Sequence, residues 1–542
     1  MPEIQVRPSA EDRSSEVSSG ILFILLFGCL LLLHIRLLHL PYIWDEAGYY
    51  VPAARDLLLT GNLLPHSTVS NAHPPVVMAW VALWWKVFGF TPLVTRTAML
   101  AVASFALLGV FRLARHVANP EVAVASVICT AVYSVFFTQS SLVHLDMAAA
   151  GFTLWGVLSY LKARMWTAAG WFALAGLAKE TAVLAPIALL LFDLIARRLN
   201  SRTTMQLHRT RSTVAVTPLA VSLLPLALWF GYHYWRTGYV FGNPEFFRYN
   251  VASTLHPLRI ILAAGMRVWQ ITGYLHLLLL TLAAALAMFC KPRRDVSGEK
   301  PRIAVPVQSV FLVLIVTYVA AMSLVGGAVL ARYMLPVLPL VIIVCVSTVW
   351  RRVPAWRAVI LLIAAGFVAA LFLNPPYGFS FEDNLAYRDY IQLHQQAEDF
   401  LEARYPMARV LTAWPASDEV ARPYLGYVTR PLRVVRIENF SYEQVASAAE
   451  VRDAFDVALV FSTKYLPPHS LLARWPWWQR IQTEFFGFHR DLPPAAAAQI
   501  LGGRLVYVAP RDGQWIGVIE MEHIMEARKN DKELPAAQAA RR

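Results

Sequence analysis

Long uninterrupted apolar runs constrain this chain more than any other feature. Residues 21–33 and 307–325, for example, are almost entirely aliphatic or aromatic. A helix needs about 20 mostly apolar residues to cross a bilayer, and several runs reach or approach that length. Of the 542 residues, 57% are hydrophobic and 15% are charged, whereas soluble domains hold roughly 45–50% apolar and about 25% charged residues. The sequence therefore predicts a multi-spanning membrane protein.

About eleven spans are expected, the first of which is retained because it lacks a small-residue cleavage site. The run 74–90 opens with Pro74-Pro75 and contains three Trp and Lys86, which favours a helix lying in the membrane interface. The predicted spans are 21–40, 93–115, 121–140, 147–163, 166–178, 181–197, 213–235, 271–290, 307–325, 332–350 and 356–373.

Basic residues set the predicted orientation. They gather in alternate loops, such as 197–211 and 291–302, and loops rich in Lys and Arg face the cytoplasm. The N-terminus is thus predicted inside and the C-terminus outside. From Asn374 onward, basic and acidic residues nearly balance. Because a nucleic-acid site needs a basic patch on a soluble domain, no nucleic-acid partner is expected.

The chain changes character after the last predicted span. Short apolar stretches alternate with polar, helix-like segments at 387–403 and 442–455, a pattern typical of a small α/β domain. The predicted domains are a disordered cytoplasmic tail (1–18), an all-α polytopic bundle (19–373), an extracytoplasmic α/β domain (374–528) and a disordered tail (529–542). The expected strands are 408–413, 432–437, 457–461, 504–508 and 515–520.

The four cysteines, Cys29, Cys129, Cys290 and Cys345, lie far apart within apolar runs. This spacing indicates neither a disulfide framework nor a zinc motif. We interpret them as small buried hydrophobic residues, and we expect no metal and no other cofactor.

Several charged or polar residues on the predicted outer side are not explained by the preference of basic residues for cytoplasmic loops. They are Asp45-Glu46, His73, His144 and Asp146, Lys179-Glu180, and Arg332-Tyr333. Each has an ordinary interpretation: solvated carboxylates, a turn histidine, a helix N-cap, or cations reaching out of the membrane. Together they are more telling, because charges in tight membrane turns are costly and usually functional.

Carboxylates and cations at a membrane surface suit the transfer of a group from a lipid phosphate. A carboxylate can accept the proton of an incoming hydroxyl, and Arg or Lys can hold the phosphate and stabilise its developing charge. A proton-coupled transporter would also place carboxylates in the membrane. The residues alone leave both possibilities open.

Six short motifs, in order, resemble those of the GT-C glycosyltransferases. The most similar group is the bacterial relatives of the dolichyl-phosphate-mannose–protein mannosyltransferases and of the lipid A aminoarabinose transferase. The motifs are Trp44-Asp45-Glu46, His73-Pro74-Pro75, His144-Leu145-Asp146, Leu177-Ala178-Lys179-Glu180, Gly242-Asn243-Pro244 and Arg332-Tyr333-Met334-Leu335-Pro336. One departure is Ala178, where the family often has Thr. The resemblance covers residues 20–373.

The resemblance implies an inverting transfer of a sugar from a polyprenyl-phosphate carrier to a lipid, glycan or protein acceptor outside the cytoplasm. The implied location is a bacterial inner membrane, whose lipids surround the bundle. Asp45 would be the base, Glu46 would position a substrate, and Asp146 would share the acidic site. The implied substrate-binding residues are His73, His144, Lys179, Glu180, Asn243, Arg332 and Tyr333, of which Lys179 and Arg332 would hold the phosphate.

Two other function classes remain open at this stage. A secondary transporter would have charges near the midplane of broken helices and an internal repeat, and we find no repeat. Alternatively, the bundle anchors an active outer domain. That domain has no Gly-rich phosphate loop, no cysteine and no evident nucleophile arrangement.

Overall fold

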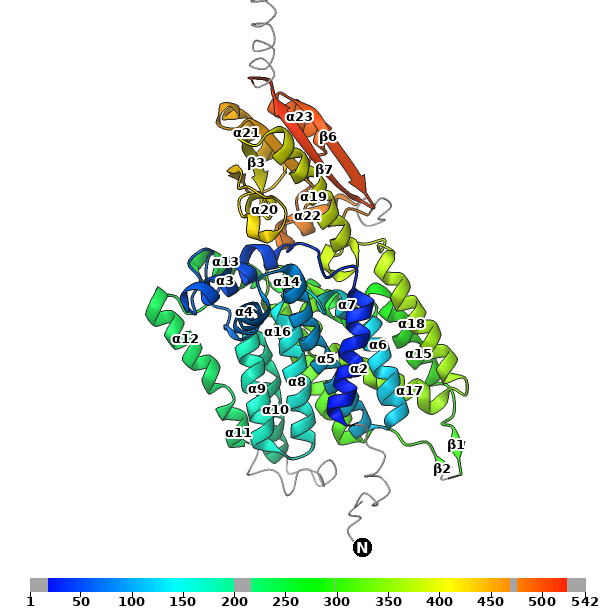
Figure 1. Ribbon diagram of the computed structural model, residues 1–542. Helices are drawn as coiled ribbons and strands as arrows, with labels where there is room; N and C mark the ends of the chain where they lie inside the picture. Colours follow the sequence, from blue (N-terminus) through cyan, green and yellow to red (C-terminus); the bar gives the residue numbers. More distant parts are fainter. Residues whose placement is uncertain (1–17, 199–215, 297, 468–474, 524–542) are drawn as a thin grey trace, which may run out of the picture.

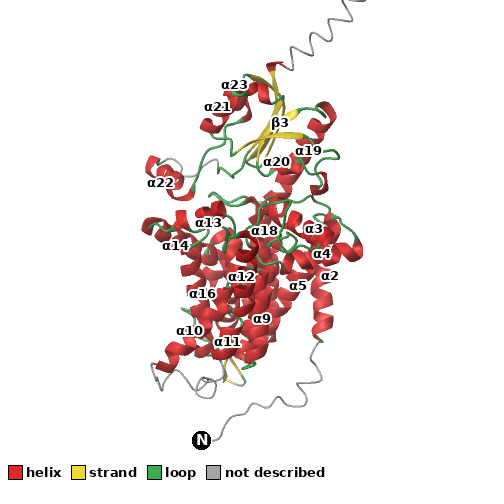
Figure 2. Cartoon of the chain, turned by 90° about the vertical axis from the view of Figure 1, so that its left-hand side faces the viewer, coloured by secondary structure: helices red, strands yellow, loops and turns green. Residues whose placement is uncertain are grey.

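The structure is a computed structural model that describes residues 18–198, 216–296, 298–467 and 475–523. A tall helical bundle carries a smaller domain with a β-sheet at one end, and the hairpin of β1 (Arg294–Asp295) and β2 (Gly298–Glu299) lies at the other (Figures 1 and 2). This agrees with the predicted helical bundle and C-terminal α/β domain. The tails predicted to be disordered lie, except for Ser18, outside the described residues.

The predicted spans are helical throughout most of their length. The helices of the bundle are α2 (Ser19–His34), α5 (Pro92–Val117), α6 (Pro120–Val132), α7 (Ser134–Gln139), α8 (Leu145–Leu161), α9 (Met165–Ala178), α10 (Leu184–Arg198), α11 (Val216–Val221), α12 (Leu224–Thr237), α14 (Pro257–Thr272), α15 (Leu277–Ala287), α16 (Val305–Leu324), α17 (Leu338–Arg352) and α18 (Trp356–Phe372).

Four of these helical stretches are both long and apolar enough to cross a membrane. They are Pro92–Val117, Val216–Thr237, Pro257–Ala287 and Val305–Leu324, and six further apolar helices are shorter. Large apolar side chains also cover the outside of the bundle: Leu362 is 74% exposed and Ile24 is 67% exposed. Exposed apolar surface of this extent marks a membrane or a partner. The count of eleven spans stays a prediction.

The region 238–270, expected as an outer loop, contains two helices. These are α13 (Pro244–Asn250) and α14, and the chain between α14 and α15 turns with positive φ angles at Leu275 (44°) and His276 (68°). Charged residues interrupt the apolar pattern of α14, so the sequence does not indicate this helix. The Arg267 guanidinium is buried and donates to the Leu330 carbonyl at 2.6 Å. The predicted single span at 271–290 was therefore wrong in its boundaries.

The run 74–90 forms α4 (Val76–Phe88), preceded by α3 (Val51–Thr60). Both helices, with α13, lie at the end of the bundle that faces the outer domain (Figures 1 and 2). Pro74-Pro75 precede α4, and Pro75 serves as its N-cap residue, consistent with a proline that begins a helix rather than interrupting one. An interfacial position for α4 stays our interpretation.

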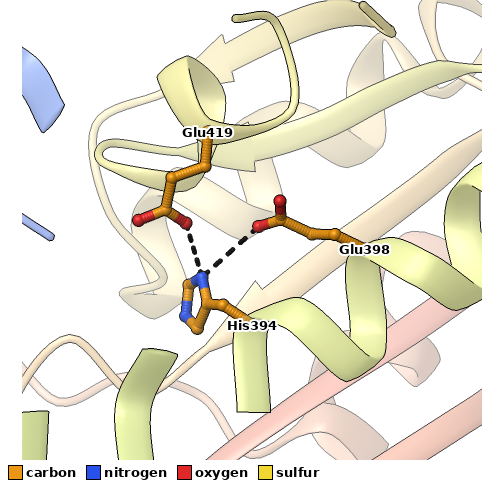
Figure 3. Close-up of side chains that lie close together, drawn as sticks. All are labelled: His394, Glu398 and Glu419. Atoms are coloured by element: carbon orange, nitrogen blue, oxygen red, sulfur yellow. Dashed lines mark hydrogen bonds and ion pairs between the residues drawn. The ribbon is translucent and has the colours of Figure 1, made fainter. Parts of the chain in front are cut away.

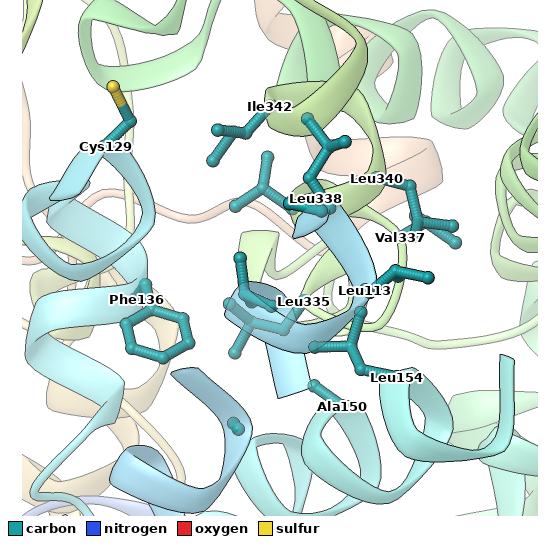
Figure 4. Close-up of a cluster of buried hydrophobic side chains, with 14 of the residues drawn as sticks. Leu113, Cys129, Phe136, Ala150, Leu154, Leu335, Val337, Leu338, Leu340 and Ile342 are labelled. Atoms are coloured by element: carbon teal, nitrogen blue, oxygen red, sulfur yellow. The ribbon is translucent and has the colours of Figure 1, made fainter. Parts of the chain in front are cut away.

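The interior of the bundle is packed with aliphatic and aromatic side chains, including Phe136, Leu154 and Leu338 (Figure 4). Cys129 belongs to this core, as predicted. Cys29 and Cys290, however, are exposed, which corrects the expectation that all four cysteines are buried. The apolar neighbours of Cys29 face outward on α2, since a membrane helix presents apolar residues to lipid as well as to its core.

The outer domain has a five-stranded sheet with the order β4-β3-β5-β7-β6. Strands β3, β4 and β5 are parallel, whereas β7 runs antiparallel to β5 and β6. The bounds are β3 (Arg409–Ala413), β4 (Arg433–Ile437), β5 (Val457–Phe461), β6 (Gly503–Arg511), β7 (Gln514–Met521), α19 (Ala386–Arg404), α20 (Ala416–Glu419), α21 (Tyr442–Glu450), α22 (Pro476–Phe486) and α23 (Pro494–Leu501).

The outer domain and the bundle share one hydrophobic core. A continuous cluster of buried residues extends from the loop after α2, through Ala47 and Val51, to Tyr390 on α19 and Val460 on β5. Burial of apolar surface stabilises a contact by roughly 25 cal/mol per Å². The outer domain is therefore fixed on the bundle, and the residues between the two can form a site.

Candidate active site

A cavity of about 670 Å³ opens where the bundle meets the outer domain. Six of the predicted site residues line it, and the outer domain adds Trp414, Thr463 and Lys464. The six predicted residues are Asp45, His73, Lys179, Glu180, Arg332 and Tyr333. Residues spread over almost 300 positions of the sequence are thus brought to one place.

Asp45 directly precedes η1 (Glu46–Tyr50), at the end of the segment that connects α2 to η1. Trp44, just before it, has a φ of 47°, a conformation that is uncommon for a bulky residue. Its indole packs edge-on against Trp414 at a ring distance of 5.1 Å. This packing holds the turn, so that the Asp45 carboxylate, 27% exposed, faces the cavity.

Arg332 is the centre of the charged network. It is buried, and its guanidinium pairs with the carboxylates of Asp45 and Glu382. A third carboxylate, on Asp146, has an oxygen 3.6 Å from Nε of Arg332. A buried arginine needs such partners, because an unpaired charge in an apolar surrounding is strongly destabilising.

His144 and Asp146 lie behind this network rather than on the cavity wall. Gln139 Oε1 lies 2.6 Å from Nδ1 of His144, so Nδ1 carries the proton, and Nε2 accepts from Arg332 at 3.2 Å. A neutral imidazole can act in this way, donating from one nitrogen and accepting at the other. His144, which is held in place by Gln139, thereby orients Arg332.

Lys179 forms the second cationic position. Its Nζ donates to Asp146 at 2.6 Å and lies 4.0 Å from the centre of the Tyr333 ring. This contact is within the range of a cation–π interaction. Beside it, Nδ1 of His73 lies 3.0 Å from a Glu180 carboxylate oxygen. Lys179 and His73 therefore each contact a carboxylate that was also predicted to belong to the site, Asp146 and Glu180 respectively.

Two further predicted site residues, Glu46 and Asn243, do not line the cavity either. Glu46 is fully buried, pairs with Arg96 and accepts from the backbone amides of Ile43 and Val143. Asn243 caps α13 by accepting from the Phe246 amide at 2.9 Å. The direct roles predicted for both stay predictions, and the geometry favours a structural role for each.

Two charged residues that line the cavity were not predicted from the sequence. Glu382 follows α18 and pairs with Arg332, and Lys464 reaches the cavity from the outer domain. Glu382-Asp383 is an acidic pair soon after a span, the same signal that singled out Asp45-Glu46. No comparable signal marks Lys464. Burial lowers the pKa of Lys464 to about 8.

Comparisons with known proteins show which family and which fold the chain resembles. Residues 72–229 match the profile of the family described as dolichyl-phosphate-mannose-protein mannosyltransferase. No curated protein sequence matches the chain. Two crystal structures of ArnT from Cupriavidus metallidurans, one bound to undecaprenyl phosphate and one in the apo state, each superpose with a TM-score of 0.51 at 14% identity. Each match covers 93% of this chain and 98% of that chain. The chain therefore has the GT-C fold, and its resemblance to the mannosyltransferase and aminoarabinose transferase-like family is confirmed.

Proposed function

We propose that the protein is a membrane glycosyltransferase that moves a sugar from a polyprenyl-phosphate carrier to an acceptor on the outer side of the membrane. The observation that carries this proposal is one cavity lined by Asp45, Lys179 and Arg332, in which Asp45 pairs with Arg332. This arrangement supports assigning Asp45 as the base and Arg332 and Lys179 as phosphate ligands. The ArnT structure with bound undecaprenyl phosphate supports the choice of carrier.

Donor binding would rearrange the ion pair between Asp45 and Arg332. The phosphodiester of the donor carries one negative charge, as a carboxylate does, and its two unesterified oxygens can form bidentate contacts with a guanidinium. With Lys179 as a second cationic ligand, it would compete with Asp45 for Arg332, while Glu382 keeps the guanidinium in place. Asp45 would then be free to accept a proton. In this scheme, donor binding itself activates the base.

The transfer step is proposed as a single displacement. Asp45 takes the proton of the acceptor hydroxyl or amine as that atom bonds to the anomeric carbon of the sugar. The bond from this carbon to the phosphate oxygen breaks, and both its electrons go to the phosphate. Arg332 and Lys179 stabilise the leaving group. Attack opposite the leaving group inverts the anomeric carbon.

The apolar wall of the cavity suits the lipid part of the donor. Phe241, Phe246, Phe247 and Met322 contribute to it, and Phe241 and Phe247 are also partly exposed. A polyprenyl chain could thus reach the cavity from the bilayer. Trp414, Thr463 and Lys464 line the cavity from the outer domain, and we place the acceptor beside them.

The proposal is tested with the full-length protein in nanodiscs and a panel of undecaprenyl-phosphate sugars, including aminoarabinose and hexose donors. With an extract of bacterial surface lipids as acceptor, we expect free undecaprenyl phosphate and a glycosylated product with an inverted anomeric centre. Failure to consume any donor, together with proton-coupled solute uptake in liposomes, would favour the transporter.

Lys464 provides a pH test of the acceptor side. With a pKa of about 8, it is charged in about nine-tenths of the molecules at pH 7 and in about one-tenth at pH 9. If the charged form binds an anionic group of the acceptor, kcat/KM for the acceptor falls by about ninefold over this range. Lys464→Arg should remove most of the fall, because arginine stays charged. Lys86→Arg, on α4, is the control and should keep the wild-type profile. An unchanged profile in Lys464→Arg would contradict the assignment.

A further inference from the structure

The outer domain holds a second buried polar cluster, away from the cavity. His394, Glu398 and Glu419 are each no more than 1% exposed. The glutamates approach the same ring nitrogen: Nδ1 of His394 lies 2.6 Å from Oε2 of Glu419 and 3.5 Å from Oε1 of Glu398 (Figure 3). The mechanism proposed above uses none of the three.

Local structure explains how the three side chains meet. His394 and Glu398 are four residues apart on α19, and residues at this spacing share one face of a helix. Glu419 ends α20, the short helix that follows β3. Stacking of the Tyr390 ring on His394, at a centroid distance of 3.9 Å, fixes the plane of the imidazole.

The charges of the cluster do not balance. Among the described residues, His394 is the only ion-pair partner of either glutamate. Both oxygens of Glu398 and Oε1 of Glu419 are buried without a hydrogen-bond partner. One imidazolium can neutralise one carboxylate at most. Because an uncompensated buried carboxylate is costly, the cluster needs one more positive charge, either a bound cation or a proton on a glutamate.

The positions of the ligand atoms match a small divalent cation. One ring nitrogen of His394 and one carboxylate oxygen from each of the two glutamates all lie within 4.8 Å of one another. Ligand atoms bonded to tetrahedral zinc at 2.0–2.2 Å are about 3.4 Å apart, close to the 3.5 Å between His394 and Glu398. Glu419 would move back by less than about 1 Å, and a water would complete the tetrahedron.

We propose that His394, Glu398 and Glu419 bind a structural zinc-type cation that joins α19 to α20. Imidazole nitrogen with carboxylate oxygens is a donor set suited to zinc. The chain just before α20 carries Trp414, whose indole packs on Trp44 beside Asp45. The cation would thus steady the outer-domain wall of the cavity without contacting a substrate.

The test uses the full-length protein, purified in detergent without chelators. Elemental analysis should find about one zinc per chain. After removal of the metal with dipicolinate, titration with ZnCl₂ should give one binding event by calorimetry and a saturable rise in Tm. Glu398→Gln and His394→Gln should each weaken binding at least about tenfold and abolish the rise in Tm. Asp399→Asn, an exposed neighbour on the same helix, should behave like the wild type.

Measurements on the metal-free protein distinguish a metal site from a cluster whose side chains only share protons. Glu398→Gln removes a buried negative charge, so without zinc it should unfold at the same temperature as the wild type or higher. Zinc should then stabilise the wild type alone. A wild type that neither contains nor binds zinc, or equal zinc stabilisation of the wild type and Glu398→Gln, would overturn the proposal. These readouts do not depend on transferase activity.

Discussion

Replacing Asp45 by asparagine should lower kcat for sugar transfer by about 10²–10⁴-fold, the range of a lost general base. The amide has nearly the shape of the carboxylate but cannot take the acceptor's proton. Arg332 keeps its pairing with Glu382, so donor binding should survive. Without the competing Asp45 carboxylate, KM for the donor should stay the same or fall. The measurement is the initial rate against donor concentration in nanodiscs.

The matched control for this experiment is Glu245→Gln. Glu245 is an exposed carboxylate in the first turn of α13, next in sequence to the cavity-lining Phe246 but not itself in the lining. We expect wild-type rates from it. If Asp45→Asn kept wild-type kcat, Asp45 could not be the base. If KM for the donor rose sharply while kcat stayed constant, Asp45 would instead bind the donor.

Much of the fold follows from local patterns in the sequence. Apolar runs predicted nearly all the bundle helices, and alternating apolar stretches predicted all five strands of the outer sheet to within a few residues. The helix α14 was missed because Arg259 and Arg267 interrupt its apolar pattern. Their charges bind backbone carbonyls inside the protein. Such tertiary compensation is invisible in a window of sequence.

The candidate site was predictable where motifs mark it. Asp45, Lys179 and Arg332 were predicted to lie on one side because alternating spans order the loops, and all three line one cavity. Glu382 was missed although Glu382-Asp383 is an acidic pair soon after a span, as Asp45-Glu46 is; only its contact with Arg332, 50 positions earlier, ties it to the site. Lys464 and the cluster around His394 depend on how the outer domain folds and docks. Three-dimensional contacts, rather than spacing, define these residues.

The sequence also could not separate the roles of Asp45 and Glu46. Successive residues on a helical turn point in different directions, and the structure shows the consequence. Asp45 faces the cavity, whereas Glu46 points into the protein, where Arg96 binds both of its carboxylate oxygens. Arg96 also donates to the carbonyls of Pro41 and Ser141 at 2.8 Å and 3.0 Å. This pair joins three segments behind the turn that carries Asp45.

Breaking the pair should therefore reduce stability before it affects chemistry. Removing one partner of a buried ion pair costs about 3–5 kcal/mol, because the other charge is left uncompensated. We expect Arg96→Met to lower the free energy of unfolding by this amount, measured by SDS titration in mixed micelles. The double variant Glu46→Gln with Arg96→Met should recover part of the loss, because no buried charge remains.

The same variants decide what Glu46 does in catalysis. If Glu46 acts only by holding the turn, Glu46→Gln should lose stability, while the folded fraction keeps a kcat within about tenfold of the wild type. The double variant should show a similar kcat per folded molecule. If Glu46→Gln instead kept its stability but lost kcat as severely as Asp45→Asn, both carboxylates would take part in the reaction. Because Glu46 has no exposed surface and its carboxylate oxygens are held by Arg96 and two backbone amides, we expect the first outcome, which leaves Asp45 as the base of the pair.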